Sequence, residues 1–272
     1  MATGTESISR RTFIRHGTCA LGGAAAATTR IAQSATSALP DGGYIDVHVH
    51  LTQRWFGDQH GPLTVRRLLR WMDARQIAQA AVLPLVSPEA FWYPVTTEFV
   101  LSETRQFRDR LIPFCAIDPR TLAAHLSVDQ AVDMLHRFRE AGARGFGEHK
   151  PKLPIDDPLN MKLYEACNEA GLPLLFHLDN FANMDQPGLP GLEKVLNAFP
   201  DLVMIGHGKG WWASIAGGLR QADLQVGYPR GPVAPGGAVD RLMEKYDNLY
   251  GDLSSSGAHA MLRDREFGSK FL

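Results

Sequence analysis

Residues 44–51 read Tyr-Ile-Asp-Val-His-Val-His-Leu, an apolar and β-branched run that contains two histidines. The turn-forming residues Asp41-Gly42-Gly43 precede it, and the whole stretch is typical of a short buried strand. Side chains alternate along a strand, so His48 and His50 project from the same face. Imidazole is a common protein ligand of zinc, iron and nickel. The pair is therefore either half of a metal site or two histidines of the hydrophobic core. Which of the two interpretations applies depends on the other residues of the chain.

Strand-like segments recur along the chain, and segments with helical apolar spacing separate them. The predicted strands cover residues 44–50, 79–85, 111–117, 143–150, 172–177, 201–207 and 248–253. The predicted helices cover residues 64–74, 126–141, 158–170, 191–199, 238–246 and 258–272. Gly142 and Gly171 follow two of these helices, at positions where glycine commonly ends a helix.

This alternation predicts an α/β fold with a parallel sheet. Successive strands lie roughly 30 residues apart, the length of one strand–helix unit. Seven such strands favour a closed (β/α)8 TIM-type barrel over an open doubly wound sheet, and no Gly-x-Gly-x-x-Gly motif follows the first strand. On this spacing the eighth strand would centre at about residue 280. The barrel domain, residues 39–272, is therefore expected to be C-terminally incomplete.

The first 38 residues differ in composition from the rest. Ser9-Arg10-Arg11-Thr12-Phe13 is followed by a weakly hydrophobic stretch rich in Ala and Gly, and then by small residues up to Ala38. This order resembles a twin-arginine export signal with its cleavage region, and the alternative is a basic tail. The signal implies that the twin-arginine translocation machinery carries the folded protein to the periplasm or out of the cell.

Composition excludes several classes of protein. The chain has 272 residues, a net charge of -1 and 44% hydrophobic residues, as expected for one soluble globular domain. Without an excess of basic residues, nucleic acid is not an expected partner. No apolar run is long enough for a membrane-spanning helix, so stable membrane insertion is not expected either.

Histidines and a carboxylate recur where the predicted strands end. His48 and His50 close the first strand, Glu148 lies at the end of the fourth, His177 closes the fifth and His207 the sixth. In a (β/α) barrel the carboxyl ends of the strands carry the active site. The sequence therefore predicts that these five side chains converge on a divalent metal.

These motifs resemble those of the amidohydrolase superfamily, specifically its amidohydrolase-related branch. The matching residues are Asp46-Val-His48-Val-His50, Leu175-Phe-His177 and Ile205-Gly-His207-Gly, and the resemblance covers residues 44–272. It implies that the four histidines bind one or two divalent metals, which a fourth-strand carboxylate or a carbamylated lysine can bridge. It also implies an aspartate on strand eight that accepts the proton of the attacking water, and that position would lie beyond Leu272.

The fourth strand offers two candidates on one face. Glu148 and Lys150 project from the same side of this strand, and His149 projects from the other. Glu148 is the predicted ligating or bridging carboxylate. Lys150 is predicted to bind a substrate carboxylate. Two alternatives are that a carbamylated Lys150 ligates the metal, or that Lys150 only forms an ion pair with Glu148. His149 is expected to pack against a helix.

Residues 208–237, between the sixth predicted strand and the helix predicted at 238–246, are expected to form an extended loop over the barrel mouth. Within this segment, Trp211 and Trp212 are predicted to line a substrate pocket, because indole rings offer large apolar contact areas. Asp252 follows on the seventh predicted strand. It is expected to contact substrate, to brace Ser254 or to be a buried structural aspartate.

The resemblance implies metal-assisted hydrolysis of an ester, amide or lactone bond in a small aromatic or carboxylated substrate. Zinc is the first choice because it suits histidines with a carboxylate, and manganese and iron remain open. The same branch of the family contains non-oxidative decarboxylases of aromatic acids, which is the first alternative. A non-catalytic periplasmic protein that binds a metal or ligand is the second.

Overall fold

The computed structural model describes residues 43–53, 61–91, 93–124, 126–226, 230–255 and 257–272. The predicted export signal, residues 1–38, lies outside the described residues. The strands are β1 (Tyr44–Val49), β2 (Ile77–Val82), β3 (Leu111–Pro113), β4 (Phe146–His149), β5 (Leu174–His177), β6 (Met204–His207) and β7 (Leu249–Gly251). The helices are α2 (Val65–Asp73), α3 (Thr97–Thr104), α4 (Thr121–Ala124), α5 (Val128–Glu140), α6 (Pro158–Glu169), α7 (Pro190–Ala198), α8 (Lys209–Ala213), a 3-10 helix (Gln221–Gln225), α9 (Ala238–Lys245), α10 (Gly257–Leu262) and α11 (Arg265–Phe271).

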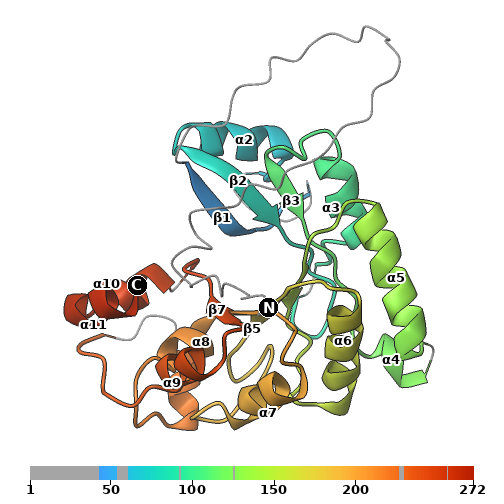
Figure 1. Cartoon of the computed structure of the whole chain (residues 1–272). Helices are drawn as coiled ribbons and strands as arrows, with labels where there is room; N and C mark the ends of the chain where they lie inside the picture. Colours follow the sequence, from blue (N-terminus) through green and yellow to red (C-terminus); the bar gives the residue numbers. More distant parts are fainter. Residues whose placement is uncertain (1–42, 54–60, 92, 125, 227–229, 256) are drawn as a thin grey trace, which may run out of the picture. The chain divides into compact units, whose positions relative to one another are not determined.

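All of these strands pair in parallel, in the order in which they occur in the chain (Figure 1). The ladder has two parts, β1-β2-β3 and β4-β5-β6-β7. Cys115 and Phe146 join them, because the Cys115 amide donates to the Gly145 carbonyl and the Gly147 amide donates to the Cys115 carbonyl, both at 2.9 Å. The result is a curled parallel sheet, which confirms the predicted α/β barrel that lacks one strand.

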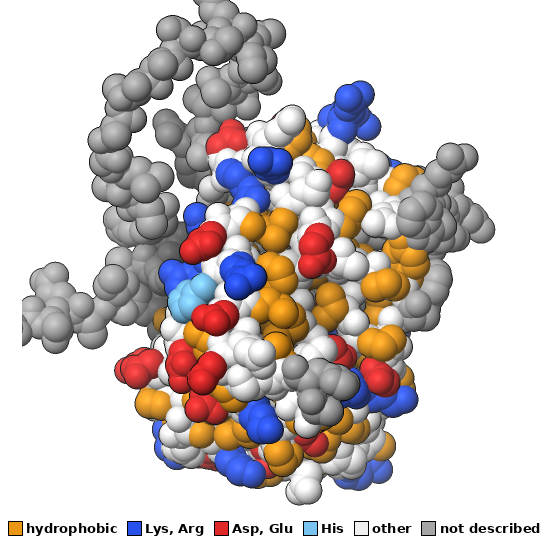
Figure 2. Space-filling model, turned by 90° about the vertical axis from the view of Figure 1, so that its right-hand side faces the viewer, with side chains coloured by type: hydrophobic (Ala, Val, Ile, Leu, Met, Phe, Trp, Pro, Cys, Tyr) orange, Lys and Arg blue, Asp and Glu red, His pale blue; other side chains and the backbone are white. Residues whose placement is uncertain are grey.

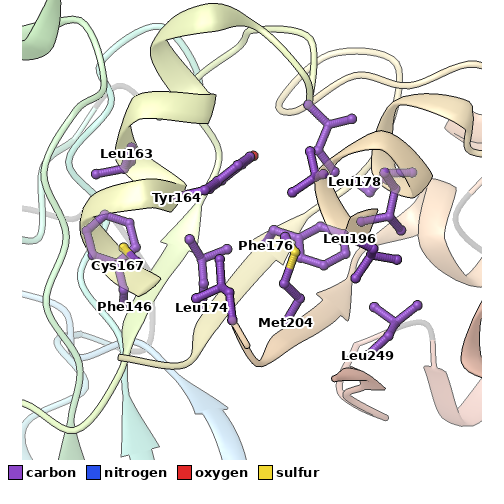
Figure 3. Close-up of a cluster of buried hydrophobic side chains, with 14 of the residues drawn as sticks. Phe146, Leu163, Tyr164, Cys167, Leu174, Phe176, Leu178, Leu196, Met204 and Leu249 are labelled. Carbon is purple, nitrogen blue, oxygen red and sulfur yellow. The ribbon is translucent and has the colours of Figure 1, made fainter. Parts of the chain in front are cut away.

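The principal core lies between the second part of the sheet and the helices that cover it (Figure 3). Leu174 of β5, Met204 of β6 and Leu249 of β7 face Leu163 of α6 and Leu196 of α7, and all five are fully buried. Burying an aliphatic side chain of this size stabilises a fold by about 1.5–3 kcal/mol. The core therefore fixes the strands whose ends carry the predicted site.

Local sequence signals set the ends of the helices. The Ser127 side chain accepts a hydrogen bond from the amide of Gln130, whose own side chain accepts one from the Ser127 amide, so a capping box begins α5. Asp157 caps α6, with Pro158 at its first position. Gly142 and Gly171 follow the same two helices with φ angles of 113° and 63°, as the sequence predicts.

Two parts of the fold differ from the prediction. Helix α3 was not expected between the second and third strands, because its sequence has no amphipathic period, and Thr96 nevertheless caps it through the Phe99 amide. The segment between β6 and the helix predicted at residues 238–246 was expected to be an extended loop, and it contains α8 and the 3-10 helix instead, whereas α9 lies where that helix was predicted. The face in Figure 2 carries basic and acidic side chains interspersed, with hydrophobic ones between them. Among the described residues, no helix could span a bilayer.

Candidate metal centre

Glu148 lies among four imidazoles at the carboxyl ends of the strands. One carboxylate oxygen, Oε2, is 3.2 Å from His50 Nε2 and 3.7 Å from His48 Nε2. The other oxygen, Oε1, is 2.7 Å from His177 Nδ1 and 3.8 Å from His207 Nε2. Glu148 thus turns one oxygen toward the histidine pair of β1 and the other toward the histidines of β5 and β6.

Strand geometry explains this convergence. His48 lies on β1 and His50 directly follows this strand, two residues further along the chain, and their Nε2 atoms are 3.1 Å from each other. His177 and His207 are direct neighbours in the register of β5 and β6. Because parallel strands end at the same edge of a sheet, five side chains from four strands reach one place.

The β1 histidines are also held from behind, through their other ring nitrogens. His50 Nδ1 is 2.8 Å from the Leu83 carbonyl, which only accepts, so this nitrogen carries the proton. His48 Nδ1 is 2.8 Å from Asp252 Oδ2, and a carboxylate imposes the same tautomer. Both rings therefore present an unprotonated Nε2 to the cluster when they are neutral, as a metal ligand requires.

The histidines of β5 and β6 follow the same rule. His207 Nδ1 is 3.0 Å from Asp252 Oδ1, which also accepts hydrogen bonds from the Ser254 amide and hydroxyl. His177 Nε2 is 3.0 Å from Asp179 Oδ2, so its Nδ1 faces the cluster. Each imidazole of the centre thus has one nitrogen fixed by an acceptor and one directed toward Glu148.

These contacts shift the pKa values of the buried groups. Burial alone would lower the pKa of His48, but its hydrogen bonds to Asp252 and Glu148 outweigh that effect and raise it to about 9. Burial alone would raise the pKa of Glu148, but its contacts with His177, His48 and His50 hold it well below its usual range. Without a metal, the cluster is a buried network of anionic carboxylates and a positively charged imidazole.

The donor set fits a divalent cation. His48, His50 and Glu148 offer ligand atoms that all lie within 4.8 Å of one another, and so do Glu148, His177 and His207. Imidazole nitrogens with a carboxylate oxygen are the ligands of zinc and of other first-row divalent metals. The structure therefore brings the five predicted ligands together, and their coordination of a metal stays a prediction.

The structure shows where the other two predicted residues of the fourth strand, Lys150 and His149, lie. Lys150 Nζ lies 3.4 Å from Glu148 Oε1, so the two share a face. His149 points away and packs against α6, where its Nε2 is 3.0 Å from Asn160 Oδ1 and its ring meets Tyr164 edge-on. Burial lowers the pKa of His149 to about 4, so this histidine is neutral at pH 7.

The residues predicted to contact substrate after β6 are buried instead of exposed. Trp211 and Trp212 lie in helix α8, not in a loop, with exposed fractions of 0% and 1%. Trp212 Nε1 donates to the Asp252 carbonyl, and Asp252 itself is 2% exposed and accepts from Ser254. Asp252 thus contacts the rings of His48 and His207, and Trp212 binds the Asp252 backbone. Contact of these residues with a substrate stays a prediction.

Asp179 is a site residue that the sequence reasoning missed. It follows His177 by two residues, contacts the ring through Oδ2, and accepts from the amides of Phe181 and Ala182 through Oδ1. Burial alone would raise its pKa, but these hydrogen bonds lower it to about 2. The signal was present in the sequence as His-x-Asp, the same period of two that identified the first pair.

Solved structures with a similar fold come from several bacteria. A TIM-barrel protein from Bordetella bronchiseptica is 18% identical, with 69% of this chain and 58% of that chain covered and a TM-score of 0.48. A probable 2-pyrone-4,6-dicarboxylic acid hydrolase from Acinetobacter baumannii is 13% identical, with 84% and 79% covered and a TM-score of 0.50. A 5-carboxyvanillate decarboxylase from Novosphingobium aromaticivorans, complexed with manganese, is 15% identical, with 61% and 65% covered and a TM-score of 0.42.

At 13% identity, the similarity to the Acinetobacter structure is evidence for a shared fold and for nothing further. The matched region spans little more than half of the Bordetella protein's length. No curated protein matches the chain. A family model described as amidohydrolase, however, matches residues 45–269, which include the described ends of all seven strands. This match covers the four histidines and Glu148 together, and the chain therefore belongs to the amidohydrolase family.

Proposed function

We propose that the protein is a metal-dependent hydrolase that cleaves an ester, amide or lactone bond of a small aromatic or carboxylated substrate. The family is metal-dependent, and zinc is the first candidate for an imidazole and carboxylate site. The observation that carries the proposal is the position of Glu148 between two pairs of imidazoles, one oxygen toward each pair. This arrangement suits a single ion with Glu148 as one of its ligands. It also suits two ions, one beside each pair of imidazoles, with Glu148 between them.

A bound divalent ion supplies Lewis acidity, which makes water a stronger acid and polarises a scissile carbonyl. The protein's own residues prepare the place for it. Asp252, Asp179 and the Leu83 carbonyl hold the imidazoles in the tautomers that leave the inward nitrogens free. The Lys150 ammonium lies beside Glu148 with its side chain 18% exposed, and it can attract a substrate carboxylate.

Non-oxidative decarboxylation of an aromatic acid is the competing reaction within the same family. The two reactions differ in what the centre needs, because a decarboxylase of this kind uses one metal without a bridging carboxylate. The two-sided position of Glu148 favours hydrolysis. We further propose that the twin-arginine signal places the protein in the periplasm or outside the cell.

The proposal is tested on purified protein loaded with zinc or with manganese. Elemental analysis gives the number of ions per chain, and a panel of esters, lactones and amides, including 2-pyrone-4,6-dicarboxylate, gives the activity. His48→Ala and His177→Ala should lose metal and activity, whereas His136→Ala, which removes an exposed histidine of α5, should keep both.

Three outcomes would contradict this assignment. Unchanged metal content in His48→Ala and His177→Ala would refute the site. Release of carbon dioxide from aromatic acids with one ion per chain would indicate the decarboxylase. A metal-loaded protein that is inert on the whole panel would favour the non-catalytic periplasmic binding protein.

A further inference from the structure

A second group of charges lies where the strands begin, at the end of the sheet opposite to the histidines. Two recesses adjoin there, with volumes of about 540 Å³ and 310 Å³, and Arg144 lines both. Arg139, His136 and Glu140 line the larger recess with it. The other charged residues of the smaller recess are Arg105 and Arg108.

These four arginines do not pair with carboxylates, unlike others in the chain. Arg110 binds Asp73 at 2.8 Å and Arg241 binds Glu193 at 2.9 Å. Within the described part of the chain, by contrast, no carboxylate forms an ion pair with any arginine of the recesses. Their positive charges are therefore uncompensated by acidic side chains in contact with them.

The hydrogen bonds of these guanidinium groups go to backbone carbonyls. Arg108 donates to the carbonyls of Gly142 and Ala141 at 2.8 and 2.9 Å, just beyond the end of α5. Arg144 donates to the carbonyls of Ala143 and Arg139 at 2.9 and 3.2 Å. The Arg105 guanidinium has no hydrogen-bond partner among the described residues.

The local charge balance is positive. The four arginines contribute four positive charges, and Glu140 removes one. The carbonyl ends of α5 and α6 together contribute roughly one further negative charge, because each helix end carries about half a charge. The balance is roughly +2 even with His136 neutral.

The pKa of Arg108 also reflects the crowding of positive charges in the recesses. Burial lowers the pKa of Arg108, and the neighbouring charges of Arg144 and Arg105 lower it further. The Nε atom of Arg108 is buried without a hydrogen-bond partner. An anion between these side chains would relieve the repulsion.

We propose that these recesses form a binding site for a small phosphate-bearing anion of the diphosphate class, with Arg144 at its centre. Guanidinium groups bind phosphate oxygens through paired N–H donors, and this site offers four such groups. The charges line concave recesses rather than a flat surface, which favours a soluble ligand over a lipid headgroup. The site is separate from the metal centre, which lies at the opposite ends of the strands.

Inorganic pyrophosphate is the probe for this site, followed by isothermal titration on the metal-free and the metal-loaded protein. Saturable binding should occur in both forms and weaken as sodium chloride is raised. Arg144→Ala should weaken binding at least tenfold. Arg105→Ala should weaken it several-fold without loss of an internal hydrogen bond, so it keeps the test valid even if Arg144→Ala unfolds.

Arg137→Ala is the matched control, because Arg137 lies on α5 but lines neither recess. This variant should bind pyrophosphate within twofold of the unaltered protein. Equal weakening in Arg137→Ala and Arg144→Ala would overturn the proposal, and so would the absence of saturable binding. Binding to vesicles of phosphatidylglycerol but not to pyrophosphate would overturn the choice of a soluble ligand.

Discussion

At the scale of residues, the four imidazoles of the centre differ in which nitrogen they turn inward. His48, His50 and His207 direct Nε2 toward Glu148, whereas His177 directs Nδ1. The acceptor behind each ring fixes this choice, and for His177 that acceptor is Asp179. The acceptors are therefore as much a part of the centre as the rings are.

Asp179→Asn should weaken zinc binding by about 10- to 100-fold, the usual effect of losing an acceptor behind a ligating histidine. The amide can still accept from His177 through its oxygen, but it can also donate to the ring and so favour the wrong tautomer. A competition titration with a chromogenic chelator measures the change. The stability of the metal-free protein should change much less than the zinc affinity.

Asp185→Asn is the control for this substitution. Asp185 is a buried aspartate of the same connection after β5, but it accepts from the amides of Gly191 and Leu192 at the start of α7. This variant should lose stability and keep its zinc affinity. Equal losses of zinc affinity in both variants would show that Asp179 acts only by supporting the loop.

The protonation of His48 predicts how the metal-free protein responds to pH. Its folded pKa of about 9 lies above the ordinary value of 6.5, so its contribution is complete below pH 6.5 and is lost as pH rises through 9. The contribution is at most about 3 kcal/mol. Urea unfolding in the presence of a chelator should show a smaller stability difference between the unaltered protein and His48→Gln at pH 9 than at pH 6. A constant difference would show that His48 is not protonated in the folded state.

At the scale of elements, the packing of helix α8 against strand β6 limits the size of the side chain at position 206. Gly206 precedes His207, and a methyl group added there would lie 2.4 Å from Cδ2 of the buried Trp211 ring. Trp211 in turn meets Phe176 of β5 edge-on, with 5.8 Å between ring centres. Glycine at position 206 is therefore required by the close approach of this indole.

Gly206→Ala should lower the free energy of unfolding by about 1–3 kcal/mol, because the ring has to move within a packed core. Urea denaturation measures the loss. The same change in a Trp211→Leu background should cost less, because the smaller side chain leaves room for the methyl group. An identical cost in the two backgrounds would exclude the indole as the cause.

The sequence allowed those parts of the centre to be predicted that depend on local period and spacing. The alternation of β1 placed His48 beside His50, and the interval between strands placed His177 and His207 at neighbouring strand ends. The role of Asp252 could not be predicted in this way, since it is 204 residues from His48. Helix α8 was missed because its five residues are too few to show an apolar period.

At the scale of the whole barrel domain, the candidate metal centre takes its side chains from both parts of the sheet. His48 and His50 belong to the three-stranded part, whereas Glu148, His177 and His207 belong to the four-stranded part. Among the described residues, the backbone hydrogen bonds that join these parts are few, namely those at the Cys115 and Phe146 bridge and those from the Arg144 amide to Pro113 and from the Glu148 amide to Pro84. A metal bound by ligands from both parts would therefore be a further connection between them.

Metal removal should therefore loosen β1 more than the centre of the four-stranded part. Hydrogen exchange followed by mass spectrometry, with and without a chelator, should show a larger rise for a peptide covering β1 than for one covering β5. Strand β5 pairs on both sides and is fully buried, whereas β1 pairs, among the described residues, only with β2 and exposes Tyr44 and Ile45. At a free metal concentration 100 times the dissociation constant, the loaded protein gains about 2.7 kcal/mol of stability. Equal rises in β1 and β5 would show that the metal stabilises the fold without joining its two parts.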